Sequence, residues 1–377
     1  MNSDIIIIGG GIIGLTLARE LHKNGVKKIT ILEKGKVGKE SSFAAAGMLL
    51  SQAEINQVDD FFQFCEDSKK LYPDFAEELL DETDIDIELD KRGTLFTAFN
   101  SQDIKEIHNR YEWQKKAGLN VEHLNDKETH KLEPFISPDS IESLYFPDDW
   151  QVENRKLIKA LEKYAKLNQI KIIENSKAKS LITENRNVKG VKTAEGDFFS
   201  NIIILATGAW VSLIKSKDSK LTIPKVKPIR GQMIKFQTAK RLFRHVIYSS
   251  FGYLVPRKSG QILAGATTED VGFAEVSSSK GVSLLKEAAY EIAPSLEALK
   301  VEESWYGFRP YTSEDGMPLI GEIANVNNLY ISTGHYRSGI LLAPISAKIL
   351  ADKILKQVHC AYLNHFSPAR FQSAKII

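Results

Sequence analysis

The sequence has few cysteines, little net charge and no apolar run long enough to cross a membrane. Its two cysteines, Cys65 and Cys360, have neither a metal-site spacing nor the pattern of a disulfide framework. Lys and Arg total 50 and Asp and Glu total 48, so the net charge of +2 gives no general attraction to nucleic acid or acidic membranes. The apolar stretch Ile5–Ala18 is shorter than the roughly 20 residues of a membrane span, and Asp4 precedes it where a signal peptide carries positive charge. These deficits predict a soluble protein of the reduced cytoplasm without stable membrane insertion.

The chain is long enough for more than one domain. Its 377 residues exceed the roughly 250–300 at which single hydrophobic cores stop growing. Hydrophobic residues make up 43% and charged residues 26%, which is typical of a globular protein. We therefore expect two domains with ordinary packed cores.

The N-terminus reads as a strand, a glycine turn, a helix and a second strand. Ile5–Ile8 is a β-branched run typical of a strand buried on both faces. Gly9, Gly11 and Gly14 have the G-x-G-x-x-G spacing, which permits a tight turn, close approach of a pyrophosphate and close helix–strand packing. Glu33 follows about 20 residues after Gly14, where its carboxylate would bind a ribose diol and repel a 2′-phosphate. The unit predicts a dinucleotide site that disfavours NADP.

Two further stretches of small residues are expected at the same site. In Gly38–Gln52, Ser41 and Ser42 precede a run of tiny residues against which a flat ring system could lie. A small-residue helix packed on the sheet is the alternative interpretation of that stretch. Ile202–Leu205 is another buried strand, and Ala206–Gly208 follows it as a tight turn at the edge where ligands bind.

The middle of the chain alternates between helical and strand patterns. Helices are expected within Gln57–Thr83, with a break at Pro73, and at Ser101–Ala117. Strands are expected near Ile87–Leu89 and Thr94–Phe99.

Short strands dominate the region from Pro224 to Arg309, and one helix interrupts them near Val282–Ile292. This pattern predicts an antiparallel sheet in a second domain. The region also holds a small basic cluster, which we interpret as a solvated face: Arg230, Lys235, Lys240, Arg241 and Arg244.

A last strand, Asn328–Ser332, leads into the turn "GHYRSG" at Gly334–Gly339 and then a helix from Ile340. A turn with two glycines and an arginine before a helix N-terminus is suited to a polar or anionic ligand. The strand and helix would return the chain to the first domain, which is then discontinuous in sequence.

Five motifs in this order resemble the D-amino acid oxidase superfamily, and within it the glycine oxidases: "GGGIIG", "SSFAAAGML", "ILATGAW", "GFRPYTSEDGMPLIG" and "GHYRSGILLAP". The likeness covers nearly the whole chain. It implies an α/β protein in which an FAD-binding Rossmann-type domain, glutathione-reductase-like, is joined to an antiparallel-sheet α+β substrate domain. The FAD domain is expected at residues 1–86, 147–222 and 311–377, and the substrate domain at residues 87–146 and 223–310.

The resemblance also implies which residues bind FAD. The ADP half would lie on the N-terminal unit, and the isoalloxazine against the small-residue stretch and the C-terminal turn. The residues expected to bind the cofactor are Gly9, Gly11, Ile12, Ile13, Gly14, Glu33, Lys34, Ser41, Ser42, Ala45, Ala46, Gly47, Met48, Ala178, Ala206, Thr207, Gly208, Trp210, Gly334, His335, Tyr336, Arg337, Ser338, Gly339 and Ile340. Related sarcosine oxidases attach flavin to a cysteine before the last turn, where this sequence has none, so we expect non-covalent FAD.

Three residues are expected to act on the substrate. The resemblance implies that Arg309, in a "GxRP" setting, pairs with the substrate α-carboxylate through its planar fork, and that the Tyr253 hydroxyl helps to hold the same group. Arg337 would serve either the flavin edge or the substrate. The implied reaction is oxidative deamination of glycine, small amines or D-amino acids, with hydride passing from Cα to flavin N5 and O2 reduced to H2O2. The imine would supply thiamine thiazole synthesis, with a thiazole synthase as its recipient.

Several alternatives stay open at this point. The chain could be a D-amino acid or sarcosine dehydrogenase that uses an acceptor other than oxygen. It could instead be an RNA-associated flavoprotein whose footprint is the basic cluster, although the low net charge argues against nucleic acid. No metal is expected, and a homo-oligomer is neither required nor excluded by the sequence.

Overall fold

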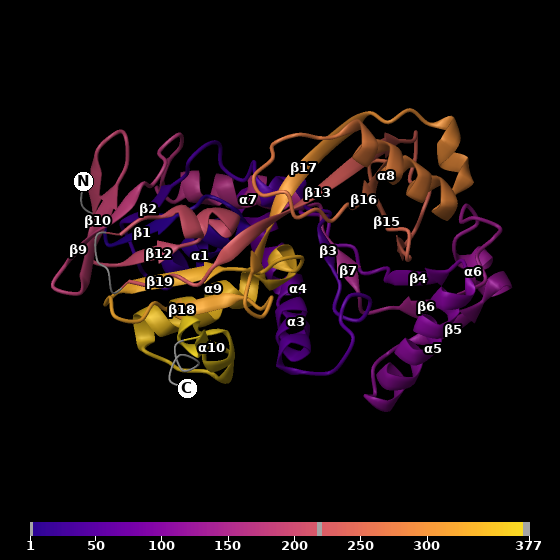
Figure 1. The fold of residues 1–377 in the computed structure, drawn as a ribbon, viewed down its shortest axis with the longest axis horizontal. Helices are drawn as coiled ribbons and strands as arrows, with labels where there is room; N and C mark the ends of the chain where they lie inside the picture. The colour runs from indigo at the N-terminus through magenta and orange to yellow at the C-terminus, as the bar shows by residue number, and fades with distance from the viewer. Residues whose placement is uncertain (1–2, 217–220, 372–377) are drawn as a thin grey trace.

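A six-stranded sheet forms the first of two lobes in this computed structural model, which describes residues 3–216 and 221–371 (Figure 1). Its strands, in spatial order, are β18 (Leu319–Glu322), β19 (Leu329–Thr333), β12 (Ile203–Leu205), β1 (Ile5–Ile8), β2 (Ile29–Leu32) and β8 (Lys171–Ile173). All pairs are parallel except β18 with β19. The sheet therefore brings both ends of the described chain together, as expected for a discontinuous unit.

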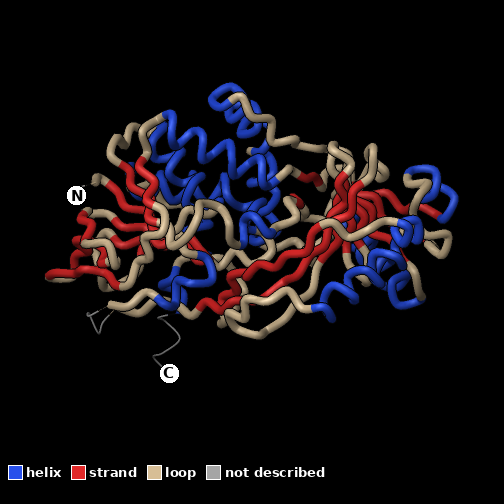
Figure 2. The backbone as a smooth tube through the Cα atoms, turned by 90° about the horizontal axis from the view of Figure 1, so that it is seen from above, coloured by secondary structure: helices blue, strands red, loops and turns tan. Residues whose placement is uncertain are grey.

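Both faces of this sheet are buried, which explains the unbroken isoleucine run of β1. Ile5 and Ile7 belong to a core shared with the helices, whereas Ile6 and Ile8 belong to a core on the opposite face. The helices gather along one face, as Figure 2 shows: α1 (Ile12–Lys23), α3 (Asp60–Lys70), α4 (Tyr72–Thr83), α7 (Asn154–Leu167), α9 (Gly339–Lys356) and α10 (Ala361–Phe366). A small sheet contributes to the other core: β9 (Ser180–Glu184), β10 (Asn187–Lys192) and β11 (Asp197–Phe199).

The second lobe is built on an eight-stranded sheet. Its strands, in spatial order, are β17 (Glu303–Thr312), β13 (Val226–Gln237), β16 (Gln261–Gly265), β15 (Tyr253–Pro256), β14 (Val246–Tyr248), β4 (Thr94–Ala98), β6 (Glu142–Phe146) and β5 (Glu122–Asn125). Its helices are α5 (Ser101–Lys116), α6 (Asp126–Leu132) and α8 (Ser279–Ile292). The expected antiparallel pattern holds except where β14 runs parallel to β4. That pairing joins the two chain segments that make up the lobe.

Shorter elements lie between the lobes. They are α2 (Ser41–Ala44), the two-stranded sheet of β3 (Met48–Leu49) and β7 (Trp150–Gln151), and the 3-10 helix at Gly208–Leu213. The 3-10 helix at Pro294–Ala298 instead packs beside α8 in the second lobe, and the one at Pro368–Phe371 packs beside β18 in the first. The long strands β13 and β17 pair from Val226 and Thr312 to Lys235 and Glu303, and they cross from one lobe to the other (Figure 1). The domain boundaries expected from the sequence stay a prediction.

One expected strand is wrong. Ile87–Leu89 forms no strand, because Glu88 has a left-handed φ of 55° and its N–H is donated to the Asp86 carboxylate at 2.7 Å. This is a turn held by an acidic side chain, which the apolar pattern alone does not reveal. The break near Pro73 is confirmed, since α3 ends at Lys70 and the proline lies in the first turn of α4.

The structure also bears on a membrane-spanning helix and on the basic cluster. Among residues 3–216 and 221–371, no helix is both long and apolar enough to cross a bilayer. The expected basic cluster is largely paired: Arg230 binds Glu269, Lys235 lies 3.0 Å from Glu303, and Arg241 lies 2.6 Å from Asp90. Paired cations of this kind do not form a free basic surface.

Candidate active site

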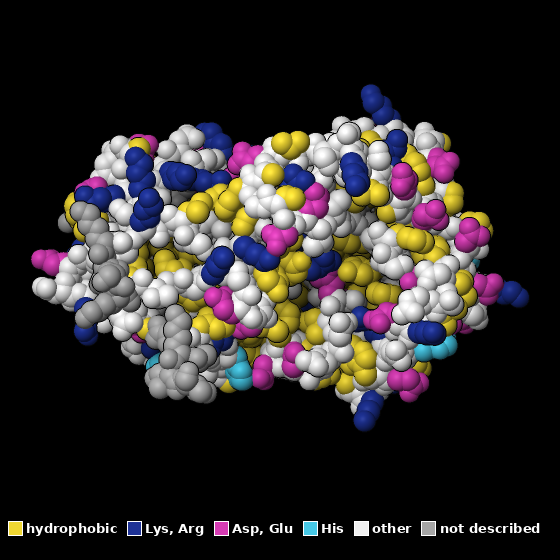
Figure 3. Space-filling model, viewed as in Figure 1, with side chains coloured by type: hydrophobic (Ala, Val, Ile, Leu, Met, Phe, Trp, Pro, Cys, Tyr) yellow, Lys and Arg dark blue, Asp and Glu magenta, His cyan; other side chains and the backbone are white. Residues whose placement is uncertain are grey.

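One elongated cavity lies where the two lobes meet, and it collects almost every residue expected from the sequence. Its walls come from the carboxyl ends of β1, β2 and β12, from residues 40–50, from the turn after β19, and from β13, β15 and β17. Of the predicted residues, all but Gly14 and Gly334 line it, including Arg309, Tyr253 and Arg337. In the space-filling view, apolar side chains show in the hollow between the lobes (Figure 3). The other lining residues that the prediction did not include are Ile8, Leu32, Glu40, Ala44, Leu50, Glu54, Lys177, Leu213, Ile214, Gly231, Met233, Gly307, Phe308, Pro310, Ser332, Thr333 and Leu341.

Gly14 and Gly334 act through packing. A Cβ on Gly14 would meet the Gly9 carbonyl oxygen at 2.0 Å, so this glycine lets α1 lie against β1, as the sequence predicted. A Cβ on Gly334 would meet Thr312 Oγ1 at 2.3 Å, and φ there is +73°. Gly334 therefore brings the C-terminal turn against β17, and its contact with the cofactor stays a prediction.

The glycine turn after β1 has the features of a pyrophosphate cradle. Gly9 has φ +111°, and a Cβ there would come within 2.4 Å of the Ala206 carbonyl oxygen. Gly11 caps α1 with no side chain of its own, so its backbone and the helix N-terminus face the cavity. Ser42 Oγ accepts the Ile12 N–H at 2.9 Å and ties the small-residue stretch to this turn. These residues fit the phosphates of the expected dinucleotide.

Glu33 lies at the end of β2 and binds the same turn. Its carboxylate accepts the N–H of Gly10 at 2.8 Å and of Gly35 at 2.9 Å. Burial raises the pKa of the Glu33 carboxyl above its ordinary value, although these two hydrogen bonds oppose the rise. Each oxygen keeps a further lone pair for a ribose hydroxyl, so the residue fits the role expected for it.

The stretch Ser41–Met48 is held by a buried arginine that the sequence analysis missed. Arg257 donates to the Ala46 carbonyl at 2.6 Å and to the Val152 carbonyl at 2.8 Å, and it is 3% exposed. Burial lowers its pKa to about 10. Gly47 is required beside it, because a Cβ there would meet the Val152 carbonyl oxygen at 2.1 Å. A flat apolar wall results, and only the tertiary fold brings Arg257 to it.

Strand β17 is pinned to this same wall. Ser41 Oγ donates to the Phe308 carbonyl at 2.5 Å, and the Trp305 indole N–H donates to the Ala44 carbonyl at 3.1 Å. Arg309 follows Phe308 directly in β17, so these contacts hold its part of the strand at the cavity wall.

The C-terminal turn closes the cavity from the other side. The Tyr336 N–H donates to the Pro310 carbonyl at 3.0 Å, which joins the turn to β17. His335 is buried with Nε2 3.0 Å from Ser346 Oγ, and burial lowers its pKa to about 3, so the imidazole is neutral. Ser338 precedes α9 without a side-chain cap, which leaves the helix N-terminus directed at the cavity. A turn so arranged stabilises negative charge on a bound ring.

Arg309 and Tyr253 form the substrate end. The Arg309 guanidinium lies over Gly231, where a Cβ would come within 2.4 Å of Nη1, and Nη1 donates to the Thr267 carbonyl at 3.0 Å. Burial raises the pKa of Tyr253, and the charges of Arg309 and Arg337 oppose that rise. An arginine fork that faces a cavity beside a tyrosine hydroxyl is suited to a carboxylate.

Arg337 has a partner that the sequence analysis did not find. Its Nη2 lies 2.5 Å from Glu54 Oε1 and 3.3 Å from the Tyr248 hydroxyl. The Glu54 charge raises the pKa of Arg337 above its ordinary value. The pair reduces the net charge available to a ligand, so Arg309 is the stronger carboxylate anchor of the two. Glu54 is the acid in "LLSQAE", directly after the small-residue stretch, and its position was the sequence signal from which this ion pair could have been predicted.

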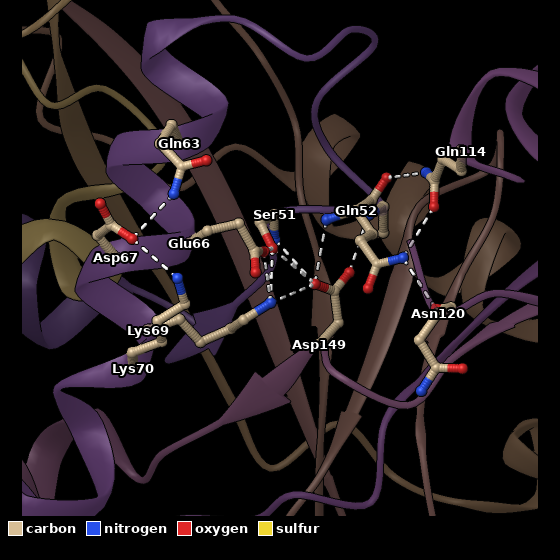
Figure 4. A network of polar contacts seen from close by, with 11 residues as sticks. Ser51, Gln52, Gln63, Glu66, Asp67, Lys69, Lys70, Gln114, Asn120 and Asp149 are labelled. Carbon is tan, nitrogen blue, oxygen red and sulfur yellow. Dashed lines mark hydrogen bonds and ion pairs between the residues drawn. The ribbon is translucent and has the colours of Figure 1, made fainter. Parts of the chain in front are cut away.

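The turn that carries Glu54 is itself held by a buried ionic network (Figure 4). Asp149 is fully buried and accepts the backbone N–H groups of Ser51, Gln52 and Ala53 at 2.9, 3.1 and 2.8 Å. Lys69 Nζ lies 3.8 Å from the Asp149 carboxylate and 2.7 Å from that of Glu66. Burial raises the pKa of Asp149, while Lys69 and the three N–H groups oppose the rise. The network fixes the backbone immediately before Glu54.

The cavity fits FAD by the chemistry of its walls. It offers a glycine cradle and helix N-terminus for phosphates, an acid for the ribose, and an apolar wall facing a second helix N-terminus for the flavin ring. Of the described residues that line it, none is a cysteine. Cys65 instead lies in the helical core, and Cys360 packs against that core.

Comparison with known proteins agrees with this geometry. The family model DAO, described as FAD dependent oxidoreductase, matches residues 4–353. The chain is 33% identical to a glycine oxidase of Bacillus licheniformis, with 93% of each chain covered. It is also 33% identical to the bifunctional protein ThiO/ThiG of Trichormus variabilis over 99% of this chain, but it spans only 56% of that relative.

Solved structures give the same result. A glycine oxidase from Geobacillus kaustophilus superposes with a TM-score of 0.92 at 30% identity, with 98% of this chain and 99% of that chain covered. An L-proline dehydrogenase from P. horikoshii superposes with a TM-score of 0.87 at 26% identity over 100% of this chain and 99% of that one. The glycine cradle and Glu33 agree with the family model, which matches most of this chain. The chain belongs to the DAO family of FAD-dependent oxidoreductases.

Proposed function

We propose that this chain is an amino-acid oxidase of the glycine oxidase kind, which oxidises glycine or another small amine and passes the electrons to O2. The observation that carries the proposal is the position of Arg309. It stands beside Tyr253 in the wall of the cavity that Ala46–Met48 also line. The glycine oxidases among the relatives support the choice of substrate class.

The roles of the chain's own residues follow from their chemistry. Bound FAD would supply the two-electron acceptor for the substrate's Cα–H. The Arg309 fork would bind the α-carboxylate through paired hydrogen bonds, and the Tyr253 hydroxyl would donate a further one. Orientation of this kind can supply much of a rate enhancement without an acid–base pair. The N-terminus of α9 would stabilise the negative charge that builds up on the reduced ring.

We further propose that FAD is held non-covalently and that the imine product feeds thiazole formation in thiamine synthesis. The absence of cysteine among the described lining residues supports the first point. The bifunctional ThiO/ThiG relatives support the second, because they join a segment like this chain to another one in a single protein. A separate thiazole synthase would be the matching partner here.

The test is peroxide release by the purified yellow protein with glycine, sarcosine, D-alanine and D-proline. We expect glycine among the better substrates. Arg309→Ala should keep its flavin and lose turnover, and Arg309→Lys should recover little, because a point charge does not reproduce the planar fork. Near-normal turnover in Arg309→Ala would refute the carboxylate assignment.

A dehydrogenase is the second candidate, since the L-proline dehydrogenase structure is also similar. It predicts that an amine bleaches the flavin anaerobically and that air restores the colour only slowly. L-Proline belongs in the same substrate panel. The RNA-associated alternative loses most of its supporting feature, because Arg230, Lys235 and Arg241 are paired with acids and only Lys240 and Arg244 of the cluster are exposed.

A further inference from the structure

Two histidines and a glutamate converge at the end of the second lobe that lies away from the six-stranded sheet (Figure 1). His108 comes from α5, His123 from the edge strand β5 and Glu142 from the start of β6. None of the three lines the cavity between the lobes. The cluster therefore stands apart from the site described above.

The fold itself brings these side chains together. His123 pairs with Leu144 across the β5–β6 ladder, and Glu142 lies two residues from Leu144, so both side chains stand on the same face of the sheet. Helix α5 packs against β4 and β6 and contributes His108. The three residues thus link two neighbouring strands and the helix that covers them.

The distances are those of a preformed ligand set. His108 Nε2 lies 3.0 Å from Glu142 Oε1, and His123 Nε2 lies 3.0 Å from Glu142 Oε2. One ligand atom from each residue falls within 4.8 Å of the others. Ligand atoms about 2.1 Å from a tetrahedral ion lie about 3.4 Å apart, so small side-chain rotations would suffice to enclose one.

The hydrogen bonding of Glu142 also favours a bound cation. Its Oε1 is buried and makes no hydrogen bond to any described residue, although His108 Nε2 is close. A buried carboxylate oxygen whose nearest nitrogen is poorly aligned for a hydrogen bond is costly, and a metal ion placed between the two would satisfy it.

We propose that His108, His123 and Glu142 bind a single zinc-class divalent ion. Two imidazoles and one carboxylate suit Zn²⁺ and its neighbours, whereas Mg²⁺ and Ca²⁺ prefer sets made of oxygen. Both histidines are partly exposed, with side-chain exposures of 57% and 36%, so water would complete the coordination. The ion would clip α5 to the strands β5 and β6 and has no part in the oxidation.

The test uses the full-length FAD-loaded protein, untagged and stripped of metals by a chelator. Titration with ZnCl2 in a calorimeter should show one saturable site, and MgCl2 should show none. His123→Ala and His108→Ala should each weaken zinc binding by more than about tenfold, since even outer-shell partners of bound zinc are worth 10- to 100-fold. Zinc should raise the melting temperature of the wild type and not that of His123→Ala.

The matched control is His130→Ala, which removes a histidine of the neighbouring helix α6 whose Nδ1 contacts the Asp126 carbonyl. It should bind zinc as the wild type does. An unchanged flavin spectrum in each variant would establish that the fold is retained. Absence of a saturable site in the wild type, or unchanged affinity in both cluster variants, would overturn the proposal and leave a histidine–carboxylate hydrogen-bond cluster in its place.

Discussion

Replacing Asp149 by asparagine should destabilise the protein more than its position outside the cavity would suggest. The carboxylate accepts three backbone N–H groups and the Ser51 hydroxyl, and it faces the buried Lys69. An asparagine of the same shape replaces one acceptor oxygen by an NH2 group, which cannot accept the N–H it would meet. It also removes one of the two carboxylate charges beside Lys69, which keeps its ion pair with Glu66.

The magnitude follows from these contacts. Breaking a buried ion pair by removing one partner typically costs about 3–5 kcal/mol, which is an upper bound here because Lys69 keeps Glu66, and leaving a buried donor without an acceptor costs about 1–3 kcal/mol. We expect the free energy of unfolding to fall by about 3–5 kcal/mol, since part of the second cost is already contained in the first. The loss should appear as a lower urea midpoint for the FAD-loaded protein.

Asp148→Asn is the matched control, because the adjacent residue is only half-buried and the N–H groups of the Ser51–Ala53 turn are donated to Asp149 instead. It should change the free energy of unfolding by less than about 0.5 kcal/mol, as surface substitutions usually do. If Asp149→Asn were no more destabilised than this control, the network would not be holding the Ser51–Ala53 turn. Combining it with Lys69→Met should give a loss smaller than the sum of the two, because the residues interact directly.

Three further predictions concern the cavity. Gly231→Ala should raise the KM for the amino acid about ten- to hundredfold, because its Cβ would displace the Arg309 guanidinium, and the flavin spectrum should be unchanged; an unaltered KM would contradict the stacking of Arg309 on this glycine. Glu33→Gln should weaken FAD binding about ten- to hundredfold, measured by flavin fluorescence, without changing which amine is oxidised; a shifted substrate profile would count against its place at the ribose. Because burial lowers the pKa of His335 to about 3 against an unfolded value near 6.5, the unfolded state binds the extra proton between these values, and stability should fall by about 1.4 kcal/mol per pH unit below pH 6.5. His335→Gln should flatten that slope in acid-denaturation curves, and a slope identical to the wild type's would exclude His335 as its source.

The sequence predicted the elements whose residues determine them locally. The N-terminal strand, glycine turn and helix appear as expected, since Gly9 and Gly14 leave the backbone few other conformations there. The wall at Ala46–Met48 and the turn at His335–Gly339 were found for the same reason.

What the sequence did not predict depends on partners far away along the chain. Arg257 reads as an ordinary strand-end arginine until β15 is placed beside the Ala46 carbonyl. Glu54 and Asp149 likewise read as surface acids, and only the packing of the two lobes buries them against Arg337 and the Ser51–Ala53 turn. Charge pairing over such separations has no periodicity from which it could be inferred.

The strand order of the six-stranded sheet has a consequence for how the protein is made. β1 carries the glycine cradle and is synthesised long before β19 and α9, which supply the opposite wall of the cavity. An incomplete chain therefore has only one side of the pocket, with the apolar edge of β12 uncovered until β19 pairs with it. A cofactor that contacts both walls would bind only the fold in which β19 has paired, so free FAD would stabilise the completed fold by binding to it.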